Sequence, residues 1–118
     1  MSYDICIRSD DTFTDKVLRS LVSDFLSAMD SVTQQSPTHL VLKDVENDVF
    51  IEFDLELVSE EGDYLDVGEV EKINCIRIHT PNANNQSEIT YLYSLCLQIA
   101  RHVGWKVFDE QEGQYVDH

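Results

Sequence analysis

The strongest pattern in the chain is a run of alternating apolar and acidic residues between Val49 and Val58. The run reads V-F-I-E-F-D-L-E-L-V, and the alternation is unbroken from its third residue to its ninth. A period of two predicts a β-strand with one buried face and one outward face. The outward face would carry a row of three carboxylates, from Glu52, Asp54 and Glu56.

Similar but shorter alternating runs predict further strands on both sides of this one. They cover Tyr3 to Arg8, His39 to Val45, Ile73 to His79 and Trp105 to Asp109, with a short terminal piece from Gln114 to Val116. The strand that begins at His39 should form a hairpin with the acidic strand, because only a short polar turn separates them.

Apolar residues at helical spacing predict two helices. The first would run from an N-cap at Thr12 to near Ser31, and the second from a cap at Ser87 to Val103, where Gly104 would end it. The segment from Thr33 to Thr38 is predicted to be a linker, because Pro37 disfavours helical backbone before it.

These elements give the order β-α-β-β-β-α-β in a single domain that spans residues 1–118. We expect an α+β fold, a two-layer sandwich of about five mainly antiparallel strands. Each helix has one apolar stripe, so both helices should cover the same face of the sheet. The opposite face, with the carboxylate row, would then be open to a partner.

The charge of the chain is concentrated in its middle. The 118 residues include 23 acids and 8 lysines or arginines, for a formal net charge of −15. Twelve of the acids lie between Asp44 and Glu71, a stretch without any lysine or arginine. Such a concentration attracts a basic protein and repels nucleic acid, so we do not expect DNA or RNA binding.

The second half of this stretch, from Ser59 to Glu71, is read as a long loop or a small hairpin. Its acids surround a few apolar residues, which is how many protein-binding patches are built. The predicted partner-binding residues in this segment are Glu60, Glu61, Asp63, Tyr64, Leu65, Asp66, Glu69 and Glu71. Two alternatives are a solvated loop whose apolar residues enter the core, and a calcium loop, although the acid spacing does not match an EF-hand.

The carboxylate row also has an alternative explanation. Four basic residues have the same outward parity on their own strands, and they could neutralise the row through cross-strand ion pairs. They are Arg8, Lys43, Arg77 and Lys106. The sequence leaves open whether the row is a docking surface or a set of internal salt bridges.

The sequence contains no recognised motif for catalysis or for a cofactor, and its candidate metal site is the calcium-loop alternative. The glycine, serine and histidine patterns of common enzyme and nucleotide-binding motifs do not occur. The acidic segment that follows Trp105 at the C-terminus is read as a turn that fixes the tail, or else as a functional loop at a strand end.

Location and assembly are constrained only in part. No apolar run approaches the ~18 residues of a membrane-spanning helix, and the N-terminus lacks a signal-peptide pattern. An odd number of cysteines (Cys6, Cys75 and Cys96) without paired spacing indicates reduced thiols in a cytoplasmic protein that does not contact membranes. The oligomeric state is not indicated.

The size, the charge placement and the ending helix-G-W-K-V-F-D-x-Q resemble small acidic immunity proteins of bacterial contact-dependent and polymorphic toxin systems. The resemblance implies a bacterial protein that neutralises a basic toxin domain, often a nuclease, by covering it. Its carboxylates would stand in for substrate phosphates. Two alternatives stay open: a small ligand-binding or regulatory protein, and a small hydrolase.

Overall fold

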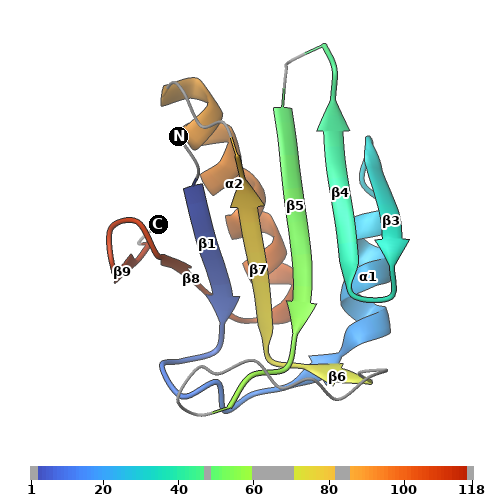
Figure 1. Cartoon of the computed structure of the whole chain (residues 1–118). Helices are drawn as coiled ribbons and strands as arrows, with labels where there is room; N and C mark the ends of the chain where they lie inside the picture. The colour runs from blue at the N-terminus through green and yellow to red at the C-terminus, as the bar shows by residue number, and fades with distance from the viewer. Residues whose placement is uncertain (1–2, 47–48, 60–70, 82–85, 117–118) are drawn as a thin grey trace.

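An open antiparallel sheet forms the front layer of the molecule (Figure 1). The computed structural model describes residues 3–46, 49–59, 71–81 and 86–116. Within these ranges the strand order is β3-β4-β5-β7-β1-β8-β9. The strands are β1 (Tyr3–Arg8), β3 (Val32–Ser36), β4 (His39–Asp44), β5 (Val49–Glu56), β7 (Cys75–Thr80), β8 (Lys106–Asp109) and β9 (Gln114–Tyr115). A separate pair, β2 (Val17–Leu18) and β6 (Lys72–Ile73), forms a second, two-stranded sheet.

Two helices make the back layer. Helix α1 (Arg19–Ser27) lies behind β3 and β4, and α2 (Gln86–Val103) lies behind β1 and β7 (Figure 1). Both helices cover the same face, so the predicted two-layer α+β architecture is confirmed. The prediction of about five strands was too low, because it missed β2, β3 and the separation of β6 from β7.

The strand β5 runs through the core as its alternation predicts. Ile51, Phe53 and Leu55 are at most 2% exposed and face the helices. Phe53 lies opposite Leu40 on β4 and Ile78 on β7. The predicted hairpin of β4 and β5 is confirmed, and its register fixes which side chains flank the acidic row.

The predicted N-terminal helix is wrong over its first half. Residues 10–16 form a loop in which the Asp10 carboxylate accepts hydrogen bonds from the backbone N–H groups of Thr12 and Thr14. A side chain that binds these groups competes with helical hydrogen bonds. Phe13 adopts a φ of 56°, a left-handed conformation that a helix does not contain. The helix therefore begins only at Arg19.

The segment predicted to be a linker is an edge strand. Residues Val32–Ser36 pair with β4, and a register shift falls between Gln34 and Ser36. Four of the five side chains are exposed, so the strand shows no hydrophobic alternation. A polar edge strand lacks the period-two signal of a half-buried strand.

The strand predicted from Ile73 to His79 is interrupted at Asn74. Ile73 belongs to β6 and pairs with Val17, whereas β7 begins at Cys75. Asn74 is 2% exposed, and its side-chain amide bonds to the backbone of Phe13 and Val58. Asn74 has the same parity as the buried Ile76 and Ile78, so it is a polar residue at a core position of the predicted strand.

The end of α2 is as predicted. Gly104 has a φ of 78°, and the Trp105 N–H bonds to the Ala100 carbonyl at 2.9 Å, as in a Schellman motif. The chain then enters β8 and β9, close to the predicted bounds. No helix in the described part of the chain combines the length and apolar character needed to cross a membrane.

Candidate functional site

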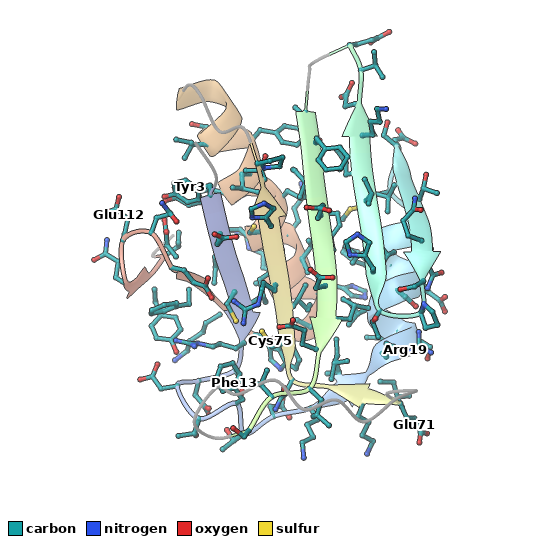
Figure 2. The ribbon with its side chains drawn as sticks, in the orientation of Figure 1. Tyr3, Phe13, Arg19, Glu71, Cys75 and Glu112 are labelled. Carbon is teal, nitrogen blue, oxygen red and sulfur yellow. The ribbon has the colours of Figure 1, made fainter. Side chains whose placement is uncertain are left out.

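The uncovered face of the sheet carries the predicted row of carboxylates. Glu52, Asp54 and Glu56 alternate with the buried residues of β5 and point away from both helices. Their side chains are 33%, 43% and 17% exposed, respectively. Figure 2 shows this face from the front, with carboxylates and imidazoles on the central strands.

An imidazole on the neighbouring strand contacts two carboxylates of the row. His39 lies opposite Asp54 in the register of β4 and β5. Its Nδ1 is 2.7 Å from Asp54 Oδ1, and its Nε2 is 3.7 Å from Glu52 Oε1. Because an ionised carboxylate accepts hydrogen bonds and cannot donate them, His39 Nδ1 donates the hydrogen bond to Asp54. An uncharged ring can make this bond, and in that state it positions the carboxylates without cancelling their charge.

A second imidazole lies on the other side of β5. His79 of β7 pairs with Glu52 in the strand register and with Asp4 of β1 on its far side. Its Nδ1 is 2.6 Å from Asp4 Oδ1. The sheet thus has an acid-imidazole-acid-imidazole order across β1, β7, β5 and β4.

Arg77 occupies the lower part of the same face. Its guanidinium Nε lies 3.0 Å from Glu56 and its Nη1 lies 2.9 Å from Glu110, which follows β8. Partial burial works against the charged form, but the hydrogen bond and charge of Glu56, with Glu110, outweigh it and raise the pKa of Arg77. The guanidinium is therefore a fixed positive charge, and Glu56 is neutralised within the chain.

The other three bases of the same parity do not contact the row through any ion pair seen among the described residues. Arg8 lies 3.5 Å from Asp11 and stacks over the rings of Phe13, Phe108 and Tyr115. Lys106 lies over the Tyr115 ring, and Lys43 is exposed beside Phe50. The predicted internal neutralisation thus applies to Glu56, whereas the contacts of Glu52 and Asp54 go to an imidazole. Arg77 also lies opposite Asp54 in the strand register, with its guanidinium directed to Glu56 and Glu110.

An exposed aromatic ring lies at the upper end of the row. Phe50 is 39% exposed and precedes Glu52 on the outward face of β5. Its neighbour across the strand is Lys43, and half-buried Val41 lies opposite Glu52. An apolar group beside charges is typical of a protein-binding surface.

Most of the predicted acidic segment cannot be placed on this surface. Glu60, Glu61, Asp63, Tyr64, Leu65, Asp66 and Glu69 lie outside the described residues. Glu71 is described and exposed, and its carbonyl accepts a hydrogen bond from the Arg19 N–H at 2.8 Å. It lies at the lower edge of the molecule, beneath the sheet (Figure 2).

The C-terminal acids are organised by one buried carboxylate. Asp109 is 1% exposed and accepts hydrogen bonds from the hydroxyls of Tyr3, at 2.6 Å, and Tyr93. It also accepts from the N–H groups of Gln111 and Glu112. Burial and then the bond to Asp109 raise the pKa of both tyrosines, so their hydroxyls stay protonated. This arrangement supports the reading of the segment as a turn that fixes the tail.

The described residues form small pockets, and one of about 340 Å³ beside β9 has Tyr93, Asp109 and Glu112 among its lining residues. The described residues contain no cluster of three or more histidines, cysteines or acids arranged to hold a metal ion. Another pocket of about 340 Å³ lies between α2, β8 and β9, with exposed Arg101 and Lys106 among its lining residues. No carboxylate, imidazole or thiol is among the described residues that line it.

The sequence reasoning missed several residues of the open face: Asp4, His39, Phe50, His79 and Glu110. For four of them the parity of an alternating strand was a usable signal, but it does not say which strands become neighbours. Glu110 lies in a turn, where no periodicity applies.

Comparison with known proteins adds no further assignment. No protein-family model, curated protein or solved structure matches this chain. The functional argument therefore depends on the geometry of the open face.

Proposed function

We propose that this protein is an acidic binding module that docks a basic protein on the open face of its sheet. The observation that carries the proposal is that the ion-pair contacts of Glu52 and Asp54 go to the His39 imidazole. Arg77 lies opposite Asp54 in the strand register, but its guanidinium contacts Glu56 and Glu110. The ion-pair network of the central strands holds five carboxylates and one guanidinium. With both histidines uncharged, it bears four net negative charges.

A surface of this kind favours a basic partner on physical grounds. Carboxylates that are fixed in place but not neutralised produce a negative potential, which speeds the approach of a positively charged protein. Phe50, with its 39% exposure, would then bury its ring in the complex and slow dissociation. The predicted acids of residues 60–71 add to the negative charge of the chain that a basic partner would meet.

The resemblance to immunity proteins specifies this proposal further. The partner would be a basic toxin domain, such as a nuclease, bound in the cytoplasm of the producing cell. Carboxylates in the positions of substrate phosphates would occupy its basic site, and the bulk of the sheet would exclude the substrate. No catalytic step is required of this chain.

The test is a comparison of matched charge variants of the full chain. The pair Glu52→Gln and Asp54→Asn removes two charges from the open face, whereas Asp24→Asn and Asp30→Asn removes two exposed charges from the helix side. Basic proteins captured from an extract of the source cell by immobilised wild type are identified and purified. Their association rates with each variant are then measured at low and high salt.

We expect the open-face pair to slow association by up to ~10-fold at low ionic strength, with little difference at high salt. The helix-side pair should have a much smaller effect. Glu56→Gln should also have less effect than Glu52→Gln, because Arg77 already neutralises Glu56. Equal association rates for the two double variants would show that the open face is not part of the interface.

Immunity is tested separately by expressing the captured basic protein in a host with and without this chain. Rescue of growth by the wild type, with weaker rescue by Glu52→Gln and Asp54→Asn, would support the immunity proposal. A captured partner that binds the open face but is not toxic would refute immunity and leave the binding module intact.

A further inference from the structure

Two of the three cysteines lie together on neighbouring strands. Cys6 of β1 and Cys75 of β7 have their sulfur atoms 2.9 Å apart, although they are separated by 69 residues in sequence. Both are at most 1% exposed. Cys96, on α2, is also buried but packs in the main core with the helices.

The distance between the two sulfurs is not far above that of a disulfide. Cys6 lies opposite Arg77, two residues from Cys75, so the two thiols are diagonal neighbours on one sheet face. A disulfide bond is ~2.05 Å long, which leaves the two sulfurs less than about 1 Å too far apart. Forming the bond therefore requires the two sulfurs to approach by less than about 1 Å.

The pair is covered by a small lid. Phe13 and Val58 complete the apolar cluster around the two thiols, and Figure 2 shows Phe13 just below Cys75 at the lower end of the sheet. The Asn74 side chain ties the lid together. It accepts from the Val58 N–H at 2.8 Å and donates to the carbonyls of Val58 and Phe13 at 2.9 and 3.2 Å.

The closed lid keeps the thiols unreactive. The hydrogen bond to Cys6, and then burial, raise the pKa of Cys75, so this thiol stays protonated near neutral pH. Thiolates rather than thiols attack oxidants. The pair would react only when local opening admits water and the oxidant. Such opening would begin at Phe13, because its φ of 56° is unfavourable for a phenylalanine.

We propose that Cys6 and Cys75 are a redox-modifiable dithiol, which closes to an intramolecular disulfide when hydrogen peroxide enters beneath the lid of Phe13 and Val58. This proposal is independent of the proposed binding function.

The chemistry balances with peroxide as the oxidant. One thiol loses its proton to solvent, and its sulfur attacks a peroxide oxygen. The O–O bond breaks, and the departing hydroxide takes up a proton to become water. The second sulfur attacks the resulting sulfenic acid, the S–S bond forms and a second water leaves. In total two thiols are oxidised, one peroxide is reduced and two waters form, and a thiol reductant reverses the change.

The first experiment exposes the folded, full chain to hydrogen peroxide and follows its intact mass and its thiol-bearing peptides. We expect the loss of two hydrogen atoms in a monomer, with Cys6 and Cys75 in one linked peptide. The Cys96→Ser variant should still form the link, whereas Cys6→Ser and Cys75→Ser should not. A link that includes Cys96, or one that forms only in denaturant, would overturn the proposal.

The melting temperature separates the proposed bond from oxidative damage. A crosslink between distant positions restricts the unfolded chain, so the oxidised protein should melt at least ~5 °C higher. Over-oxidation of a buried thiol to a sulfinic or sulfonic acid would lower the melting temperature. A decrease in melting temperature together with a mass gain would therefore contradict disulfide formation.

The role of the lid is tested by Asn74→Ala and by Phe13→Ala. Each variant should form the same link at least several-fold faster than wild type under conditions in which the chain is folded. Phe13→Ala keeps the Asn74 bonds to Val58. If Asn74→Ala does not fold, Phe13→Ala therefore decides whether the lid controls access to the thiols. Unchanged rates in a folded variant would show that the lid does not control access.

Discussion

Asp109 provides the sharpest test of how the C-terminal turn is held. Its carboxylate is 1% exposed and accepts hydrogen bonds from two tyrosine hydroxyls and two backbone N–H groups. Asp109→Ala would remove all four bonds at once. The two hydroxyls would lose a partner in a largely buried site, whereas the backbone groups of Gln111 and Glu112, in an exposed turn, can bind water.

The expected cost follows from these differences. A buried polar group left without a partner costs ~1–3 kcal/mol, and hydrogen bonds to a charged acceptor are at the strong end of the range. The Tyr3 and Tyr93 hydroxyl oxygens lie 2.6 Å apart and can still bond to each other, so one donor is left without a partner, at ~1–3 kcal/mol. The other lost bond to a charged acceptor adds ~1.5–3 kcal/mol, and the end of carboxylate desolvation returns part of the total. We expect a net loss of ~3–4 kcal/mol in unfolding free energy for Asp109→Ala. This is a large share of the ~5–15 kcal/mol typical of a domain.

Urea denaturation followed by circular dichroism measures this loss. Asp24→Ala, which removes an exposed carboxylate from α1, is the control and should change stability by no more than ~0.5 kcal/mol. A double-mutant cycle with Tyr3→Phe should show a coupling of ~1–2 kcal/mol, because the phenylalanine variant no longer has a hydroxyl to strand. Full additivity of the two substitutions, or a cost below ~1 kcal/mol for Asp109→Ala, would refute the reasoning.

Three further predictions test local features. Burial, followed by the bond to Asp109, raises the pKa of Tyr3. The folded state therefore keeps the Tyr3 proton, which the unfolded state loses near pH 10. The midpoint of urea unfolding should fall as pH rises above ~10, and it should fall less steeply in Tyr3→Phe. The Thr14 hydroxyl, and then its N–H, lower the pKa of Asp10 to about 2. The contribution of ionised Asp10 to the free energy of unfolding is therefore present above pH ~4 and lost as pH falls toward 2. An NMR titration of the Asp10 carboxyl should give a midpoint of about 2, and this midpoint should move upward in Thr14→Val. Gly104→Ala should cost ~1 kcal/mol in thermal or urea unfolding through its φ of 78° alone, because an added Cβ meets no atom within 4 Å.

The elements that the sequence predicts well are those with one buried face. The strand β5 and helix α2 pack one side against the core, so the spacing of their hydrophobic residues in the sequence predicts the element and its buried face. The edge strand β3 buries almost nothing and shows no period. The first helix was placed too early because Phe13 fits its apolar stripe, whereas in the structure Phe13 covers the two thiols.

The candidate site divides in the same way. The outward direction of Glu52, Asp54 and Glu56 followed from period two alone. Their partners depend on which strands become neighbours, and β7 lies beside β5 only after a long intervening segment. The roles of His39 and His79 were therefore not visible in the sequence, although both residues have the outward parity of their strands.

The three carboxylates that the sequence presents as one row are physically different. Glu56 is bonded to a guanidinium that is always charged, so its field is cancelled nearby. Asp54 is held at 2.7 Å by an imidazole, which fixes its direction through a hydrogen bond and leaves its charge in place while the ring is neutral. Self-repulsion of this kind destabilises an isolated domain, and a basic partner would relieve it. The steering charges of the proposed interface are therefore Glu52 and Asp54, and Glu56 serves mainly to join β5 to Arg77.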